Sequence, residues 1–312
     1  MDAFVRLSDQ DNVVTVTEDL AAGSVVAGVT LRDDVPQGHK VAVATIADGA
    51  PLYKYAQRIG TAHGAIAPGS HVHSHNLDFQ PVSTQYEFST AAEAVQAAAV
   101  ADSFQGYRRD TGGVGTRNYI AVLTSVNCSA TAARHIANAF TELELADYPN
   151  VDGVVAYVHG TGCGMSGREG FEALNRVMHG YAQHPNHAGV LLVGLGCEML
   201  QLDTLLERYG LQSGPLFQAM NIQDCHGLRA TVERGVEIVR AMLPIANEAK
   251  RERCPASELK VALQCGGSDA WSGVTANPAL GYACDLLVTQ GGTGVLAETR
   301  EIYGAEHLLT RR

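Results

Sequence analysis

The stretch Tyr119-Ile120-Ala121-Val122-Leu123-Thr124-Ser125-Val126-Asn127-Cys128-Ser129 decides the expected fold of this chain. Residues 119–126 form an apolar run of the length expected for a buried strand, and a helical pattern begins at Thr131. Parallel strands need long crossover connections, which helices commonly supply. The alternation therefore predicts an α/β domain with a mostly parallel sheet.

The same alternation recurs through the rest of the chain. The strand candidates are Tyr119–Val126, Val151–Val158, Gly189–Leu195, Pro215–Ile222, Leu259–Gln264 and Asp285–Gln290. The helical candidates between them are Thr131–Leu145, Arg168–Tyr181, Met199–Tyr209 and Gly227–Glu252. Gly160-Thr161-Gly162-Cys163-Gly164 follows a strand but misses the G-x-G-x-x-G spacing, and a Walker lysine is absent, so a nucleotide site is not expected.

The N-terminal part has a different pattern. Short extended segments such as Val13–Val16, Val41–Ala44 and His71–His73 are separated by Gly, Pro and Asp turns. We therefore expect a small all-β domain over residues 1–80, a linker over 81–106 and a Rossmann-like α/β domain over 107–312. A new helical unit starts at Glu298 and the chain stops at Arg312, so we expect a C-terminal truncation with a downstream domain absent.

Composition limits the functional class. The chain has 312 residues, 46% of them hydrophobic, a formal net charge of −11 and a pI near 5.5, which disfavours a nucleic-acid surface. No apolar run approaches the roughly 20 residues that cross a bilayer, so no membrane partner is expected. Seven cysteines, an odd number without disulfide-rich spacing or a preceding signal peptide, favour a reduced, cytoplasmic compartment.

Cysteines follow several of the predicted strands. Cys128, Cys163 and Cys197 each lie beside small residues directly after a strand candidate, and Asp269 occupies a comparable place after Leu259–Gln264. Ligands of parallel sheets bind beyond the carboxyl ends of the strands, so we expect these four residues around one pocket. The thiols are candidate metal ligands, and the alternative is that they are small residues in close-packed turns.

Three alternating histidines give a second candidate for metal binding. In a strand His71, His73 and His75 would share one face, with the outer pair about 13 Å apart. We interpret His71 and His73 as a ligand pair. The alternative is an exposed polar strand edge.

Other polar residues adjoin the strand candidates. His159 is placed to act as a base near neutral pH, or else to be a core histidine bonded to backbone. Glu198 and Asp269 could bind hydroxyl groups or a cation, and either could instead cap the following helix. Arg117, with Asn118 beside it, could pair with a substrate carboxylate, or be a solvated arginine between domains.

Several longer motifs together resemble the altronate/galactarate dehydratase family, which includes sulfolactate sulfo-lyase. The motifs are Val35–Ala42, Tyr55…Ile59-Gly60, Gly69–Asn76, Gly106–Arg108, Gly113–Asn118, Gly194–Glu198, Gln264–Asp269 and Ser272–Pro278. The first eighty residues resemble the family's SAF β-clip domain. The histidine segment resembles altronate-type members, whereas Cys254–Leu259 and Gly281–Val288 resemble galactarate-type members.

The resemblance implies metal-dependent loss of water from a sugar acid to give a 2-keto-3-deoxy acid. Fe²⁺ is the implied metal, with Mn²⁺ or another divalent cation as a substitute, because a cation is needed to stabilise the enediolate. We assign catalytic roles to His159 and Glu198, and substrate binding to Arg117, Asn118 and the set Ser268, Asp269 and Asn277. The metal candidates are His71, His73, Cys128, Cys163 and Cys197, and we expect a homodimer.

Two other interpretations are open. Cys128, Cys163 and Cys197 could hold a [4Fe–4S] cluster with one iron free for the substrate hydroxyl, as in a cluster-dependent dehydratase or related lyase. The chain could also be a non-catalytic module that binds sugar acids or takes part in assembly.

Overall fold

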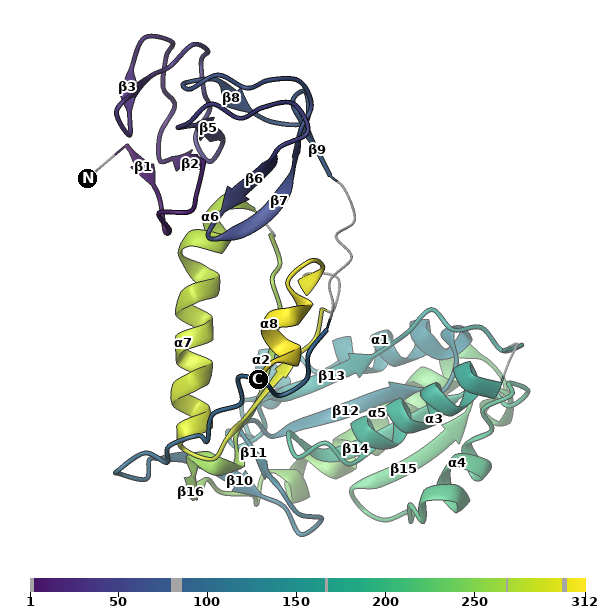
Figure 1. The fold of residues 1–312 in the computed structure, drawn as a ribbon. Helices are drawn as coiled ribbons and strands as arrows, with labels where there is room; N and C mark the ends of the chain where they lie inside the picture. The colour runs from purple at the N-terminus through teal and green to yellow at the C-terminus, as the bar shows by residue number, and fades with distance from the viewer. Residues whose placement is uncertain (1–2, 80–85, 166–167, 268, 299–301) are drawn as a thin grey trace. The chain divides into compact units, whose positions relative to one another are not determined.

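The computed structural model describes residues 3–79, 86–165, 168–267, 269–298 and 302–312. The chain divides into two compact units (Figure 1). One contains Met1–Ala98 together with Lys260–Arg312, and the other contains Ala99–Leu259. This division differs from the expected one, because 260–312 groups with the N-terminal residues rather than with the preceding α/β segment.

The N-terminal part of the first unit consists of short strands, as predicted. A four-stranded antiparallel sheet has the order β1 (Phe4–Val5), β2 (Val13–Val16), β5 (Lys40–Ala42) and β8 (His71–Val72). A three-stranded antiparallel sheet contains β6 (Pro51–Lys54), β7 (Gln57–Ala62) and β9 (Leu77–Asp78), and β3 (Val25–Val26) pairs with β4 (Val29–Thr30). Two small apolar clusters hold these sheets together.

The C-terminal part of the first unit is α/β. Strands β17 (Lys260–Leu263) and β18 (Thr293–Leu296) are parallel, and helices α6 (Ala270–Val274) and α7 (Ala276–Thr289) connect them, with α8 (Glu306–Thr310) following. The strand expected at Asp285–Gln290 is therefore wrong, because Asp285–Thr289 is the last part of α7. A short apolar run fits a buried helix as well as a strand, and here the helical segment that precedes it continues.

The second unit contains a four-stranded parallel sheet. Its order is β13 (Gly153–Tyr157), β12 (Tyr119–Thr124), β14 (His187–Gly194) and β15 (Phe217–Asn221). Alternate residues of β12 face opposite sides: Ile120 and Val122 pack with one buried cluster, and Ala121 and Leu123 pack with another. The sheet is therefore apolar on both faces, as a parallel sheet covered by helices requires.

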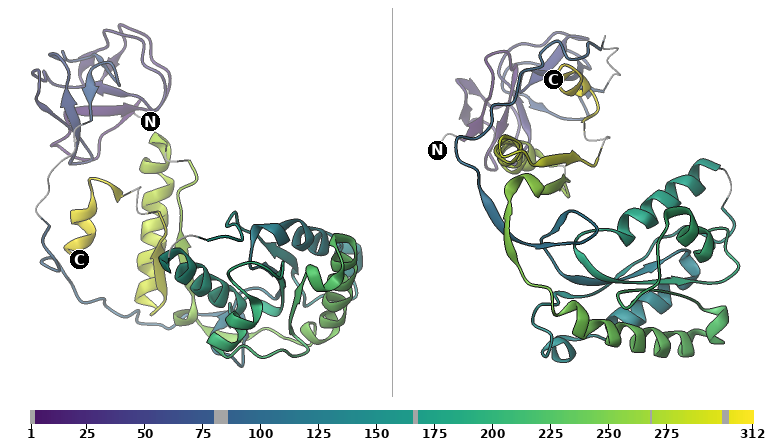
Figure 2. Two further views of the ribbon diagram at one scale, coloured as in Figure 1. Left: turned by 90° about the vertical axis from the view of Figure 1, so that its right-hand side faces the viewer. Right: turned by 90° about the horizontal axis from the view of Figure 1, so that it is seen from below.

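Helices cover the two faces of this sheet (Figures 1 and 2). Helices α1 (Ala130–Asn138) and α5 (Leu228–Ala246) contribute to the cluster that contains Ile120, and α3 (Arg168–Ala182) and α4 (Leu202–Tyr209) contribute to the cluster that contains Ala121. The short helix α2 (Glu142–Leu145) follows α1. Each parallel strand is thus followed by helix, as the sequence pattern predicted.

A small antiparallel sheet precedes the parallel one in the chain. Strand β10 (Ser103–Arg108) pairs with β11 (Val114–Gly115) and with β16 (Glu252–Pro255), which follows α5. The expected linker over 81–106 therefore extends too far, because its last residues are fixed by pairing with β16. Residues 86–102 contain no helix or strand.

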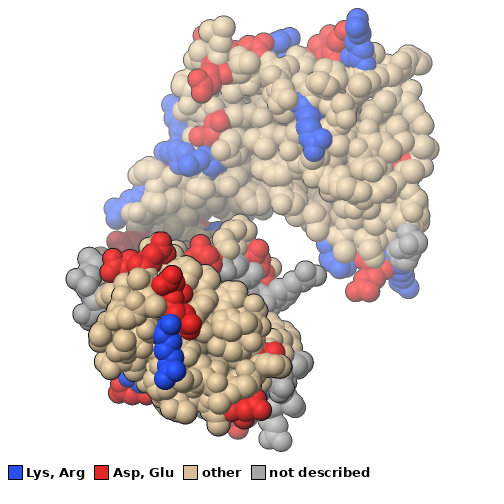
Figure 3. All heavy atoms as spheres, turned by 90° about the horizontal axis from the view of Figure 1, so that it is seen from above, with Lys and Arg blue, Asp and Glu red and all other residues tan. Residues whose placement is uncertain are grey.

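Across the residues that the structure describes, no helix combines the length and apolar character needed to cross a membrane. Figure 3 shows one face of the molecule, on which Lys and Arg side chains are interspersed with Asp and Glu side chains and with uncharged residues.

Candidate active site

The strand order of the second unit marks one place on the sheet. From β12 the chain passes to β13 on one side and then to β14 on the other, so the connection changes direction between β12 and β14. In open parallel sheets ligands bind beyond the carboxyl ends of the strands at such a switch point. The loops that follow β12, β13 and β14 therefore form the candidate site, called the carboxyl edge below.

The loops that carry the three cysteines lie next to one another at the carboxyl edge. The backbone N–H of Asn127 donates to the carbonyl of Thr161 at 2.9 Å, and that of Met199 donates to the carbonyl of Cys163 at 3.1 Å. Cys128, Cys163 and Cys197 are all exposed free thiols. Neighbouring loops thus present three accessible sulfur atoms along one edge of the sheet.

Glu198 is the polar centre of this edge. It is only 3% exposed, and its Oε1 accepts hydrogen bonds from Ser125 Oγ (2.6 Å) and the Leu195 N–H (3.0 Å), while Oε2 accepts from the Gly196 N–H (2.7 Å). Burial opposes ionisation, but these hydrogen bonds outweigh it and lower the pKa of Glu198. Glu198 is therefore an ionised anchor that joins the β14 loop to β12.

His159 also uses both of its ring nitrogens to fix a loop. Nδ1 accepts from the Thr161 N–H at 3.1 Å, so Nε2 carries the hydrogen and donates to the carbonyl of Thr124 at 2.9 Å. This is the backbone-bonded arrangement that the sequence left open. Proton transfer by His159 would require one of these bonds to break.

Arg117 and Asn118 lie at the opposite edge of the sheet from the cysteines. They precede β12, and a strand of its length places them about 20 Å from its carboxyl end. Asn118 is fully buried; its amide donates to the carbonyls of Asn150 and Ala246 and accepts from Arg109. The prediction that both residues bind the same substrate as the cysteine loops is not supported by this placement.

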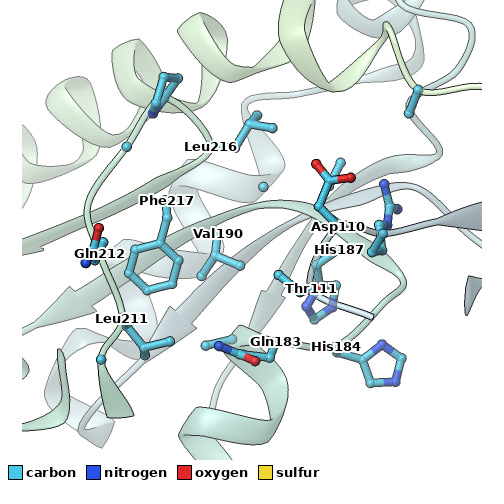
Figure 4. Close-up of a pocket in the computed structure, with 18 of the residues that line it drawn as sticks. Asp110, Thr111, Gln183, His184, His187, Val190, Leu211, Gln212, Leu216 and Phe217 are labelled. Carbon is cyan, nitrogen blue, oxygen red and sulfur yellow. The ribbon is translucent and has the colours of Figure 1, made fainter. Parts of the chain in front are cut away.

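A cavity of about 560 Å³ lies at this amino edge, near the starts of β14 and β15 (Figure 4). The side chains of Val190, Leu211 and Phe217 line it together with His184 and His187. His187 donates from Nδ1 to the Tyr181 carbonyl (2.8 Å) and accepts from the Tyr157 hydroxyl (3.0 Å). Burial lowers the pKa of His187 to about 4, so the ring is neutral near pH 7.

The predicted histidine pair belongs to a larger group in the first unit. Strand β8 ends at Val72 and the chain then turns, so the rings of His73 and His75 come within 5.7 and 5.6 Å of His71 between centroids. His39 directly precedes β5, the strand that pairs with β8, and its Nδ1 lies 2.9 Å from Nε2 of His71. Burial is the main cause that lowers the pKa of both His39 and His71. His39 was not among the predicted ligands, although it lies within the motif Val35–Ala42.

Gly69 determines how the chain enters β8, the strand that begins with His71. Gly69 has a φ of +84°, and a Cβ there would collide with the carbonyl oxygen of Thr30. Only glycine fits both the left-handed backbone and the close approach. His71 therefore enters β8 from a turn that other residues would disrupt.

The remaining predicted residues lie in the first unit. Asp269 caps α6, accepting from the Ser272 N–H at 2.7 Å, which is the capping role left open above. Asn277 and Cys265 line a cavity of about 300 Å³, with 3.8 Å between the Asn277 amide and the Cys265 sulfur. Ser268 lies outside the described residues. The expectation of one pocket shared by Asp269 and the three cysteines stays a prediction, because Asp269 belongs to the other unit.

No formed metal site is present in the part of the chain that the structure describes. No group of three or more His, Cys, Asp or Glu side chains there is arranged to hold an ion. The exposed thiols and the histidine group supply suitable donor atoms. As placed in the structure, however, they do not form a complete coordination shell.

Sequence comparisons identify relatives along nearly the whole chain. Residues 2–80 match the altronate/galactarate dehydratase SAF domain, residues 106–247 match the second domain of D-galactarate dehydratase/altronate hydrolase, and residues 256–312 match the C-terminal part of D-galactarate/altronate dehydratase. These three matches belong to one family, and the first of them agrees with the SAF domain expected over the first eighty residues.

Three relatives show a similar level of identity. Altronate dehydratase of Escherichia coli (strain K12) is 37% identical over 98% of this chain and 62% of the relative. Altronate dehydratase of Bacillus subtilis (strain 168) is 32% identical over 100% and 63%, and galactarate dehydratase (L-threo-forming) of E. coli (strain K12) is 38% identical over 99% and 61%. The chain thus spans about three fifths of the length of these relatives, and the identities do not separate the two substrates.

Proposed function

Because this chain belongs to the altronate/galactarate dehydratase family, we propose that it takes part in the metal-dependent dehydration of a sugar acid to a 2-keto-3-deoxy acid. The observation that carries this proposal is that three segments of one family match the chain in succession. Relatives that match nearly the whole chain are named as altronate or galactarate dehydratases. The reaction is that of a hydro-lyase, and the substrate class is altronate or galactarate.

The second unit supplies the scaffold in this proposal. The order β13-β12-β14-β15, with helices on both faces, supports a Rossmann-like arrangement with its site at the carboxyl edge. Glu198 and His159 hold the loops of this edge through hydrogen bonds to backbone and to Ser125. We therefore propose that both act as positioning residues, because their polar atoms are already engaged.

The proposed metal is Fe²⁺ or another divalent cation, which would stabilise the enediolate formed when the proton beside the carboxylate leaves. The described residues do not present a complete set of ligands for it. As metal ligands, His71, His73 and the three carboxyl-edge thiols stay predictions.

Turnover under anaerobic conditions tests the proposal. The chain would be incubated with altronate or galactarate and Fe²⁺ or Mn²⁺, and the 2-keto-3-deoxy acid measured. We expect metal-dependent product, lower activity for Glu198→Gln, and unchanged activity for the matched exposed variant Glu207→Gln. Folded chain that forms no product from either acid with either metal would contradict the proposed activity.

A [4Fe–4S] enzyme is a second candidate, favoured by the exposure of three thiols on hydrogen-bonded loops. Anaerobically purified protein would then show broad visible absorption that disappears in Cys163→Ser. A nearly colourless active protein would support the mononuclear metal instead. Binding of the acids without turnover would support the interpretation as a binding or assembly module.

A further inference from the structure

Two of the four lysines of this chain project from the core-facing side of the N-terminal strands. Cross-strand partners in β2 and β5 are Val13 with Ala42 and Thr15 with Lys40, so Thr15 and Lys40 share the face of the first pair. Val13, Ala42 and Leu52 belong to one buried apolar cluster. Lys54 lies two residues after Leu52 on β6 and therefore also shares its face.

These lysines are not ordinary surface charges. Both are partly buried, in contrast to the exposed Lys250 and Lys260. Burial lowers the pKa of Lys40, and burial together with the charge of Lys40 lowers the pKa of Lys54. The Lys54 ammonium lies 4.6 Å from the centroid of the Tyr55 ring. Core-facing positions normally carry apolar residues, and charged ones there usually have a functional reason.

The carboxylate that faces Lys54 is already occupied. Asp11 is 2% exposed, and its two oxygens accept from the backbone N–H groups of Ser8 (3.2 Å) and Ala56 (2.8 Å). Asp11 offsets part of the positive charge of Lys54. Lys40 and Lys54 together carry two positive charges, so one of them is not balanced by this carboxylate. The region therefore has capacity for one more negative charge.

Two hydroxyl groups beside the lysines are unused. Thr15 is 1% exposed, and neither its Oγ1 nor the buried Tyr55 Oη has a hydrogen-bond partner among the described residues. Burial raises the pKa of Tyr55 and the nearby Thr15 hydroxyl opposes this shift, but the geometry of the two hydroxyl groups is not that of a hydrogen bond. A buried hydroxyl without a hydrogen-bond partner is unfavourable, and a bound acceptor would supply that partner.

The backbone that presents Tyr55 is strained. Tyr55 and Ala56 form the turn between β6 and β7, and both have a φ of +58°. A turn of this kind normally selects Gly or Asn, because other side chains are unfavourable in the left-handed region. Strain retained at such a position is typical of sites where a side chain must be aimed.

We propose that Thr15, Lys40, Lys54 and Tyr55 form a binding site for the carboxylate of a small organic acid. Two partly buried ammonium groups supply charge, and two hydroxyl groups supply hydrogen-bond donors. The inference deepens the proposed function, on which its choice of probe rests, because a sugar acid carries such a carboxylate. It gives the N-terminal strands of the first unit a role in substrate binding.

Site-resolved lysine modification tests the site directly. The full chain would be acetylated at low reagent concentration, without metal, and each lysine quantified by peptide mass spectrometry. At a galactarate concentration four times Kd, we expect about fivefold slower modification of Lys40 and Lys54, because four fifths of the sites are then occupied. Lys250 and Lys260 should be unchanged, and the uncharged galactitol should give no protection.

Three results would overturn the proposal: no protection at saturating galactarate, equal protection of all four lysines, or equal protection by galactitol. Inorganic phosphate is a further arm. Protection by phosphate equal to that by galactarate would replace the carboxylate site with an unspecific anion site and so contradict the proposal. Because no metal or turnover is involved, these results are independent of the dehydration assay.

Variants separate binding from folding. Lys54→Met should keep or raise the melting temperature, because a partly buried charge leaves a core-facing position, while galactarate affinity falls about tenfold or more. Tyr55→Phe should fold normally and weaken binding about fivefold through loss of one hydrogen bond. Lys250→Met is the matched control and should bind as the parent does. Unchanged affinity in folded Lys54→Met would overturn the site.

Discussion

The two edges of the parallel sheet in the second unit use polar residues in different ways. At the amino edge, Asn118, Arg109 and His187 are bonded to other parts of the protein and connect secondary-structure elements. At the carboxyl edge, Glu198 and His159 hold loops from which thiols remain exposed. A cavity of about 560 Å³ lies at the amino edge, whereas the exposed thiols lie at the carboxyl edge. We therefore propose that the exposed thiols mark the functional edge of the sheet, and that the polar residues of the amino edge have a structural role.

The largest expected effect is on the amino edge. Asn118→Ala leaves the carbonyls of Asn150 and Ala246 and an Arg109 N–H without their partner, so we expect a loss of about 3–4 kcal/mol in unfolding free energy. The exposed Arg117→Ala should change it by less than about 0.5 kcal/mol. Urea denaturation measures both. A small effect of Asn118→Ala would contradict the structural role given to this edge.

Glu198→Gln should have the next largest effect. The amide would place an N–H group against one of the backbone donors that now bind the carboxylate, at a cost of about 2–3 kcal/mol. Glu207→Gln is the control, because Glu207 is exposed. If the thermal stabilities of the two variants were equal, Glu198 would not anchor the carboxyl edge.

The pH dependence of stability should report on His187. Its folded pKa is lowered to about 4, whereas the unfolded side chain takes up a proton near pH 6.5. The contribution of neutral His187 to the unfolding free energy is full above pH 6.5, and about 3 kcal/mol of it is lost as the pH falls toward 4. His187→Gln should flatten this part of the stability curve, and the exposed His135→Gln should leave it unchanged. Identical slopes for the two variants would remove His187 as the cause.

The smallest effect on stability should come from the thiols. Cys128→Ser and Cys197→Ser remove exposed groups, so each should change the unfolding free energy by less than about 0.5 kcal/mol. Cys254→Ser, at a fully buried position, should cost clearly more, and it serves as the comparison. Comparable losses at all three positions would mean that the carboxyl-edge cysteines are structural.

Much of this contrast was predictable from local pattern. The apolar runs gave β12, β13, β14 and β15 with small errors at their ends, and parallel topology then placed the cysteine loops together. The strand assigned to Asp285–Gln290 failed because periodicity cannot separate a short buried strand from the end of an apolar helix. Local sequence was sufficient where the pattern of a strand could be distinguished from that of a helix.

Long-range partners were not predictable. His39 reaches His71 only through the antiparallel register of β5 and β8, in which Val41 is opposite His71. Asn118 and Arg117 looked like substrate ligands because sequence shows residue type and not whether its hydrogen bonds are already used. The same limit applies to His159, whose backbone partners depend on the contact between two loops.

Alkylation of the folded chain with iodoacetamide, quantified for each cysteine, tests the central claim most directly. With galactarate and Fe²⁺ under anaerobic conditions, we expect slower labelling of the exposed Cys128, Cys163 and Cys197 than in their absence. Glu198→Gln should lessen this protection, and the amino-edge variant His184→Gln should retain it. Unchanged labelling of all three carboxyl-edge thiols at saturating galactarate and Fe²⁺ would contradict the assignment of the site to this edge.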